Sequence, residues 1–360
     1  MENTTVEVEF EAISNEVVLD NIKYQLDSQT KTATVISGGN DLSGEVVIPS
    51  RFFIKEEFYN VTSIGEQAFH RNSAITSVTI PNSVISIGEI AFGACENLSS
   101  ITIPNSVTEI GDGAFYGCSA LKNINLPSGL TKIGESMFWG CTSLTSVNIP
   151  EGVTTIAKEA FRECSVLSSI TIPNSVTEID NFAFYRCRGI TSMAIPSGVK
   201  SIGSSALEDC TSLTSLTLNE GLETIGGSAF EGCTGLKTLT IPSTVKSILL
   251  NAIKNCTNLT EVYCLAENVP DTDDNAFDGT PTEKSTLHVP ANAIDAYKST
   301  WPWSDFKEIV ALETDGMNDI KAEATDADIY SVNGYRTSKL QRGLNIIRQS
   351  DGKVRKVLVR

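Results

Sequence analysis

The sequence predicts a repeat solenoid in which each 23-residue coil adds a strand to a parallel β-sheet and returns through short turns or helices. Three columns of residues, each spaced by 23 positions, support this prediction. The first is isoleucine throughout, the second is an Ala-Phe pair with few exchanges, and the third is cysteine. The isoleucine column consists of Ile64, Ile87, Ile110, Ile133, Ile156, Ile179, Ile202, Ile225 and Ile248. Nine coils therefore follow one another without an insertion or a deletion.

A period of 23 residues falls within the range of leucine-rich repeats, whose units bury their apolar edges only by stacking on one another. One coil, Leu98 to Cys118, reads LSSITIPNSVTEIGDGAFYGC. Its Ile101 and Ile103 alternate with polar residues, as in a short strand with one face in the core. Pro104 ends this strand because proline has no amide proton for the ladder. A second extended piece follows from Val107 to Ile110, and the Ala-Phe pair then fills the core from a short turn or helix.

A glycine column lies directly after the isoleucines. It comprises Gly65, Gly88, Gly111, Gly134, Gly203 and Gly226. Ala157, Asp180 and Leu249 occupy the same position in other coils. A backbone with positive φ would exclude leucine and alanine. The column therefore indicates a position with little room for a side chain.

Eight cysteines also recur once per coil. They are Cys95, Cys118, Cys141, Cys164, Cys187, Cys210, Cys233 and Cys256, with Asn72 at the same position of the first coil. Equivalent side chains on successive coils point the same way, so their Cβ atoms lie about 4.8 Å apart, beyond the roughly 3.5 to 4.5 Å of a disulfide. We therefore predict a ladder of buried, reduced thiols, with Asn72 pointing inward to bond loop backbone. The even spacing and the presence of only two histidines argue against a metal site, and no cofactor is expected.

Composition excludes several classes of partner. The 27 basic and 44 acidic residues give a formal charge of -17, which repels a phosphate backbone, so we expect no nucleic acid partner. The chain has no run of about 18 apolar residues, so we expect no transmembrane segment. Residues 1 to 20 lack the basic start and apolar stretch of a signal peptide. We expect an exported protein whose signal peptide is absent from the printed sequence.

We predict that the protein is not an enzyme. Between Ile64 and Ile248 the repeat never breaks to gather polar residues in a pocket. His70 and His288 lie far apart in sequence and have no evident nucleophile or carboxylate partner, which favours ordinary surface residues. The acidic tract at 271–274 lacks the glycine and distal glutamate of a calcium loop, so we expect a solvated loop there.

The position after the Ala-Phe pair carries large side chains in the middle coils. We predict the partner-binding site around this column, at Tyr116, Trp139, Arg162, Tyr185, Arg186 and Arg188. Tyrosine, tryptophan and arginine are enriched in binding hot spots. The competing interpretation is that these amphipathic side chains only cover the short turn beneath them.

The outward strand positions carry small hydroxyl and amide side chains, among them Thr102, Asn125 and Thr171. Such a face has few anchors for a tight protein interface, but it suits a flat hydrogen-bonding partner such as a glycan or another repetitive surface. Small polar residues also simply keep an exposed sheet soluble. Two alternatives to a protein-binding module therefore stay open: a glycan binder that uses the Ser/Thr strand face, and a purely structural surface-layer solenoid.

The coil TSVTIPNSVISIGEIAFGAC, from Thr76 to Cys95, resembles the BspA-type leucine-rich repeats of bacterial surface proteins. The stretch from Ala327 to Arg360 resembles the C-terminal sorting domains of proteins exported by the Bacteroidetes, and its Asp351-Gly352 pair predicts a hairpin turn. These resemblances imply a cell-surface or secreted, adhesin-like protein that binds a host or microbial surface protein.

The same resemblance implies a cap at each end of the solenoid, and a bare terminal coil would otherwise expose core and sheet edge. In the C-terminal cap we expect a short helix around Ile294 and Tyr297, followed by aromatic plugs at Trp301, Trp303 and Phe306. The expected parts are a β-rich N-terminal cap at 1–60, the solenoid at 61–290, the C-terminal cap at 291–312, a linker at 313–319 and a small sorting-like β domain at 320–360.

Overall fold

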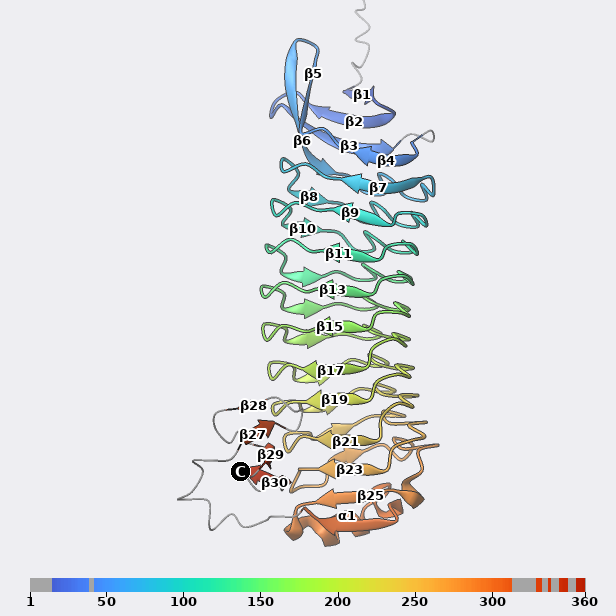
Figure 1. Cartoon of the computed structure of the whole chain (residues 1–360), viewed down its shortest axis with the longest axis vertical. Coiled ribbons are helices and arrows are strands. Elements are labelled where there is room, and N and C mark those ends of the chain that lie inside the picture. The colour runs from blue at the N-terminus through green and yellow to red at the C-terminus, as the bar shows by residue number, and fades with distance from the viewer. Residues whose placement is uncertain are drawn as a thin grey trace, which may run out of the picture.

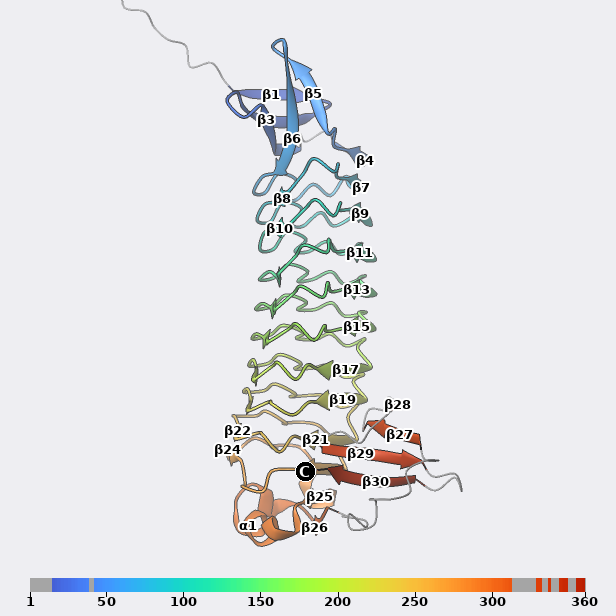
Figure 2. The same ribbon diagram turned by 90° about the vertical axis from the view of Figure 1, so that its left-hand side faces the viewer.

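The chain folds as a parallel β-solenoid whose coils stack along one axis (Figure 1). The computed structural model describes residues 15–38 and 42–312 and, as backbone alone, residues 328–331, 336–337, 343–348 and 354–359. Each coil contributes two strands, which lie on different faces of the stack (Figures 1 and 2). The predicted repeat solenoid is confirmed.

The strand face is formed by the longer strand of each coil. These strands form four sheets, and within each sheet equivalent residues pair in parallel across neighbouring coils, as Ser77 does with Ser100 and Asn123 with Ser146. The strands are β4 (Gly44–Val47), β7 (Ile75–Thr79), β9 (Ser100–Thr102), β11 (Asn123–Asn125), β13 (Ser146–Asn148), β15 (Ser169–Thr171), β17 (Ser192–Ile195), β19 (Ser215–Leu218), β21 (Thr238–Ile241), β23 (Glu261–Cys264), β25 (Thr286–Val289) and β26 (Glu308–Ala311).

A second ladder contains the repeated isoleucines. Its two-residue strands are β8 (Ser86–Ile87), β10 (Glu109–Ile110), β12 (Lys132–Ile133), β14 (Thr155–Ile156), β16 (Glu178–Ile179), β18 (Ser201–Ile202), β20 (Thr224–Ile225), β22 (Ser247–Ile248) and β24 (Asp271–Thr272). The segment that carries the Ala-Phe pair follows each of these strands, and in the coils it consists of turns without a helix. We call this side of the molecule the turn edge; in one coil it comprises residues 88–95.

The turn edge has a hydrogen-bond pattern that alternates along the chain. The amides of Ile90 and Phe92 donate to the next coil, at 2.9 Å from the Asp112 carbonyl oxygen and 2.8 Å from that of Ala114. The amide between them, that of Ala91, donates within its own coil to Gly88. This alternation requires left-handed backbone at Ile90 (φ 52°) and Ala94 (φ 54°), and equivalent non-glycine residues repeat it along the stack. Such backbone is costly for residues other than glycine, so it persists only because the coil above and the coil below both fix it.

The core is built from columns of identical side chains. The phenylalanine rings from Phe69 to Phe184 stack with centroids 5.1 to 5.7 Å apart and interplanar angles of at most 15°. Each of these rings is fully buried. The rings follow the coil spacing, so the register of the backbone imposes their near-parallel stacking.

The structure confirms that the glycine column marks a position with little space for a side chain. A Cβ atom at Gly111 would lie 2.4 Å from the amide nitrogen of Glu89, and one at Gly88 would lie 2.6 Å from that of Glu66. Neither glycine has a positive φ. At this position each coil therefore touches the backbone of the coil before it.

The cysteine column lies inside the stack. All nine cysteines fall within the described residues, where they are buried and free of disulfides. Each thiol of the column donates to the carbonyl at the phenylalanine position of the preceding coil, at 3.0 to 3.3 Å. Burial raises the pKa of the Cys95 thiol to about 12. Thr280 closes the column, and its hydroxyl donates at 2.6 Å to the carbonyl of Ile253. Asn72, expected to point inward, is only partly buried and accepts a local bond from the amide of Ala74.

An antiparallel cap covers the first coil. Its strands are β1 (Glu16–Leu19), β2 (Ile22–Asp27), β3 (Thr32–Gly38), β5 (Arg51–Ile54) and β6 (Glu57–Ile64). Strand β6 pairs in parallel with both β3 and β8, so one strand crosses the boundary expected at residue 60. The hairpin of β5 and β6 projects beyond the end of the stack (Figures 1 and 2).

The other end of the stack is closed by β26, by helix α1 (Ile294–Ser299) and by the short 3-10 turns at Thr282–Lys284, Ala291–Ala293 and Trp303–Asp305. Trp303 is fully buried, and its ring centroid lies 5.2 Å from that of Phe277 and 5.3 Å from that of Tyr297. Phe306 is buried as well. The expectation for Trp301 is wrong, because its side chain is 53% exposed. The plug therefore consists of Trp303 and Phe306.

A four-stranded antiparallel sheet is formed near the C-terminus, in the order β28-β27-β29-β30. Its strands are β27 (Asp328–Ser331), β28 (Arg336–Thr337), β29 (Gly343–Arg348) and β30 (Val354–Val359). Strands β29 and β30 pair as the sequence predicts. The Asp351-Gly352 turn and the linker at 313–319 lie outside the described residues.

The phenylalanine column gives a test of core packing. We expect Phe138→Ala to lower the free energy of unfolding by about 3 to 5 kcal/mol, because it leaves a cavity between two stacked rings. Phe138→Leu should cost less than about 1.5 kcal/mol, since it largely conserves volume and Leu207 already occupies the same position three coils on. Urea denaturation followed by circular dichroism measures both, and equal losses would contradict the stacking argument.

The thiol column predicts sensitivity to alkali. Burial holds the native pKa values of these cysteines above the unfolded value, to about 12 for Cys95, Cys210 and Cys256. Below about pH 8.5 the thiols are protonated in both states. As the pH rises further, only the unfolded state loses these protons, and each thiol lowers the free energy of unfolding by about 1.4 kcal/mol per pH unit until its native pKa is reached. Urea titrations between pH 8 and pH 11 should show this fall, and a flat profile would contradict it.

Candidate functional site

Five of the six residues predicted to bind a partner form one connected group on the turn edge. Tyr116, Trp139, Arg162 and Tyr185 occupy the same position in four successive coils, and Arg186 follows the last of them. The ring centroids of Tyr116 and Trp139 lie 5.2 Å apart with a tilt of 58°. The coil register thus brings together residues that are 23 positions apart in sequence.

Arg162 is held between two aromatic rings. Its guanidinium carbon lies 4.7 Å from the ring centroid of Trp139 and 4.9 Å from that of Tyr185. Its Nη1 donates to the Glu159 carboxylate at 3.0 Å, and its side chain is 25% exposed. Cation–π contacts of this kind contribute roughly 0.5 to 1 kcal/mol each at accessible sites.

Arg186 continues the stack by one more step. Its guanidinium carbon lies 4.8 Å from the ring centroid of Tyr185, and its Nε is 3.3 Å from a carboxylate oxygen of Asp209. Glu163 lies 3.9 Å from Arg186 and 3.8 Å from Arg162, so it bridges the two cations. We call Tyr116, Trp139, Arg162, Tyr185 and Arg186 the ring–arginine stack.

Arg188 stands apart from this stack. Its side chain is exposed and makes no ion pair or hydrogen bond with the part of the chain that the structure describes. Within the stack, Tyr116 is 38% exposed and Arg186 is exposed, whereas Trp139, Arg162 and Tyr185 are half-buried. The side chains therefore both cover the turn beneath them and present a partly accessible surface.

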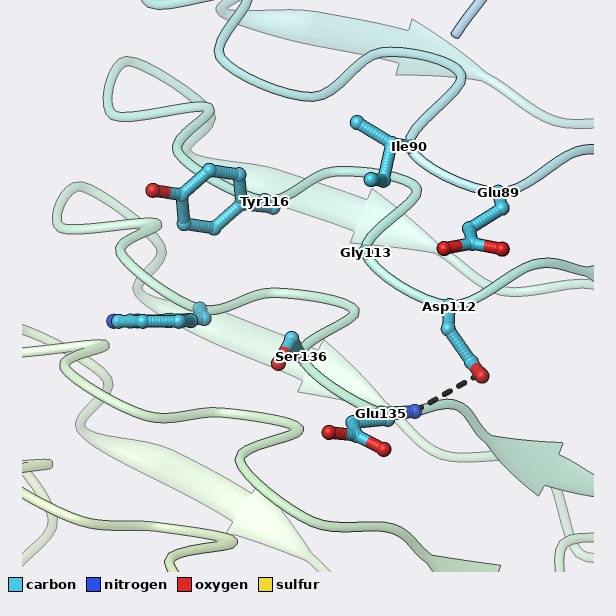
Figure 3. Close-up of a pocket in the computed structure, with 8 residues that line it drawn as sticks. Glu89, Ile90, Asp112, Gly113, Tyr116, Glu135 and Ser136 are labelled. Atoms are coloured by element: carbon cyan, nitrogen blue, oxygen red, sulfur yellow. Dashed lines mark hydrogen bonds between the residues drawn. The ribbon is translucent and has the colours of Figure 1, made fainter. Parts of the chain in front are cut away.

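A pocket of about 390 Å³ opens beside the N-terminal end of the stack (Figure 3). Figure 3 shows the Tyr116 ring on one side, the carboxylates of Glu89 and Asp112 on the other, and Gly113 between them. The remaining lining residues are Ile90, Glu135, Ser136 and Trp139. These carboxylates were not among the predicted site residues, although the same 23-residue spacing aligns Glu66, Glu89, Asp112 and Glu135 in one column.

The strand face presents the small polar side chains that its sequence pattern predicts. Thr102, Asn125 and Thr171 are exposed, whereas Thr217 is only 6% exposed. A shallow hollow of about 490 Å³ lies on this face, with Ser169, Thr171, Ser192, Ala194, Ser215 and Thr217 among the residues that line it. It offers hydroxyl groups but no aromatic or charged side chain.

The histidines are placed in different surroundings. The His288 Nε2 atom lies 2.7 Å from a carboxylate oxygen of Glu261, and its ring stacks at 4.2 Å on Tyr263. The Nδ1 atom of His70 is buried without a hydrogen-bond partner among the described residues.

In residues 15–38 and 42–312, no group of three or more His, Cys, Asp or Glu side chains is arranged to hold a metal ion. None of the helices in the described chain combines the length and apolarity needed to cross a membrane.

The stack also contributes to stability, and Arg188 provides a matched control. We expect Arg162→Ala to lower the free energy of unfolding by about 1 to 2 kcal/mol, because two ring contacts and the bond to Glu159 are lost together. Arg188→Ala should stay within about 0.5 kcal/mol of the unchanged protein. Urea denaturation compares the two variants. If both are neutral, the contacts of Arg162 contribute nothing to the fold.

Comparison with solved structures found similar repeat proteins. A leucine rich cell surface protein from Faecalibacterium prausnitzii A2-165 shares 23% identity over 83% of this chain and 95% of that chain, with a TM-score of 0.38. The leucine rich repeat protein of T. pallidum shares 27% identity over 61% of this chain and 90% of that chain, with a TM-score of 0.41. The pneumococcal vaccine antigen PcpA shares 19% identity over 84% of this chain and 99% of that chain, with a TM-score of 0.43.

Among curated proteins, no sequence matches the chain. The family model described as BspA type leucine rich repeat region matches residues 62–191 and 177–299. These matches cover more than half of the chain and include every coil from the first repeated isoleucine to the C-terminal cap. The protein therefore belongs to the BspA-type leucine-rich-repeat family.

Proposed function

We propose that the protein is a non-catalytic binding module that holds another protein at its turn edge. The observation that carries the proposal is the ring–arginine stack, in which Trp139, Arg162 and Tyr185 are ordered by mutual contacts and remain partly accessible. Large side chains that are already fixed lose little conformational entropy on binding. Aromatic residues and arginine are also the types most often found as hot spots.

The turn edge is better suited to a protein partner than the strand face. The stack exposes parts of three rings and two guanidinium groups in one connected area. The strand face instead presents side chains such as Thr102 and Ser192, and truncation of serine or threonine in an interface usually costs little. We therefore assign the protein interface to the ring–arginine stack.

We further propose that the module acts outside the cell, as an adhesin-like protein bound to a host or microbial surface protein. The chain belongs to the BspA-type leucine-rich-repeat family. This membership supports the extracellular setting, because the repeats resemble those of bacterial surface proteins. On this proposal the parts are a cap at 1–60, the solenoid at 61–290, a second cap at 291–312, a linker at 313–319 and a sorting-like unit at 320–360. Deletion of residues 320–360 should abolish surface display, and unchanged display would remove that role.

Affinity capture followed by alanine substitution tests the turn edge. Partners cross-linked to the intact protein would be identified first by mass spectrometry. Trp139→Ala and Tyr185→Ala should then weaken binding by about 2 kcal/mol or more each if they are hot spots. Thr102→Lys and Thr171→Lys, which place bulk and charge on the strand face, should have little effect. The opposite pattern would move the binding site to the strand face.

A second candidate is a glycan binder that uses the strand face. The hollow lined by Ser169, Thr171 and Ser192 favours this alternative, because adjacent hydroxyls can bond a sugar that lies flat on the sheet. A glycan array with the intact protein separates the two candidates. Glycan binding that Thr171→Lys abolishes and Trp139→Ala leaves unchanged would support the second candidate against the first.

A further inference from the structure

We propose that the pocket between Tyr116 and the Glu89–Asp112–Glu135 carboxylates receives a cationic side chain, lysine or arginine, from the protein partner. This inference rests on the proposed function, because it names the chemistry that one part of the turn edge recognises. The pocket volume of about 390 Å³ is near the lower end of ligand sites. It suits one long side chain rather than a folded segment.

The chain itself contains a template for this interaction. Two coils after Gly113 and Tyr116, the same two columns carry Glu159 and Arg162. Arg162 lies 4.7 Å from the ring centroid of Trp139 and 3.0 Å from a carboxylate oxygen of Glu159. A cation held between an aromatic ring and a carboxylate is therefore an arrangement that this backbone already supports.

The pocket also combines aromatic rings with carboxylates, although its carboxylates come from the column before that of Glu159, and no lysine or arginine is among its lining residues. The Tyr116 ring lies on one side and the carboxylates of Glu89 and Asp112 lie on the other (Figure 3), and Trp139 and Glu135 also line the pocket. Cations are attracted to aromatic faces by the ring quadrupole, and tryptophan is the strongest of these partners. The combination favours a long side chain with an apolar stem and a charged end.

The pocket is open because one column changes in size along the stack. Gly113 forms its floor, whereas the equivalent position of later coils carries Glu159 and Phe182. All three residues have left-handed backbone, with φ of 60°, 59° and 58°. The column therefore tolerates a large side chain at this φ, and glycine at 113 leaves space without a change in the main chain.

The charges around the pocket leave it net acidic. Lys132 lies 3.6 Å from Asp112 and Lys158 lies 3.5 Å from Glu135, but both pairs are solvent-exposed and such pairs contribute little. Glu89 is exposed and has no ion-pair partner among the described residues. The formal charge of -17 adds a general attraction for basic segments. A flexible basic stretch of a protein is the partner that fits.

The decisive experiment fills the pocket without changing its charge. The probe is a short peptide with two lysines flanked by glycine and serine, titrated calorimetrically into the full chain at low ionic strength. Gly113→Phe should weaken binding about two- to fivefold, because the added side chain occupies the pocket and keeps the lysine from its contact with the Tyr116 ring. Asn251→Phe is the matched control, because it adds the same ring in the same column at φ 59°, six coils away. It should bind as the unchanged protein does.

Two further binding measurements do not depend on whether Gly113→Phe folds. Glu89→Gln should weaken the peptide more than Glu151→Gln, an equal charge change at an exposed residue outside the pocket. The same peptide with both lysines acetylated should not bind measurably. Equal binding to the acetylated peptide, or no difference between the two glutamine variants, would overturn the proposal.

These outcomes are distinct from failure of the proposed function. Partner binding that is lost in Tyr185→Ala, together with unchanged peptide affinity in Gly113→Phe, would uphold the turn edge as the interface and overturn the cationic pocket. The reverse result would be a loss of peptide affinity in Gly113→Phe together with unchanged partner affinity in Trp139→Ala and Tyr185→Ala. It would support the pocket and contradict the stack as the protein interface.

Discussion

The backbone hydrogen bonds between successive coils are the interaction on which the rest of the structure depends. The amide of Ser99 donates to the carbonyl of Thr76 at 2.9 Å, and that of Phe92 donates to Ala114 at 2.8 Å. Because the bond at the phenylalanine position recurs in every coil from Phe69 to Ile253, each residue of the repeat lies over its counterpart in the next coil. The coil spacing then determines which side chains can touch, and a single residue has little freedom to leave its column.

The same constraint explains why unfavourable features are retained. Left-handed backbone at residues such as Ile90 and Phe182 is costly in isolation, yet the amides on either side bond alternately to the next coil and to the same coil. The buried thiols are similar. Each places a weak donor in an apolar core, and the phenylalanine carbonyl of the preceding coil accepts it. In both cases the neighbouring coil supplies the partner that one coil lacks.

The fold was predictable because its determinants are periodic in sequence. The uninterrupted isoleucine column and the Ala-Phe column with its few exchanges required a register of 23 residues, and parallel strands with buried rings follow from that register. The left-handed turns were not predictable, because residues as different as Ile90, Glu159 and Phe182 adopt them and no glycine pattern marks the position. Trp301 was misjudged because three aromatic residues close together in the C-terminal cap do not reveal which ring faces outward. The carboxylate column at the pocket was visible in the sequence, but only the structure shows that three of its members line one pocket with Tyr116 and Trp139.

A site on such a scaffold arises by substitution within columns and not by a new backbone. The ring–arginine stack uses the position after the Ala-Phe pair, which is glycine at Gly93 and glutamate at Glu208 in other coils. Those coils keep the same hydrogen bonds, as the amide of Phe92 and that of Leu207 show at 2.8 Å each. The turn edge can therefore vary in size and charge while the core columns remain constant. In the proposed function, recognition is concentrated in the middle coils, where aromatic rings, arginines and carboxylates lie in adjacent columns.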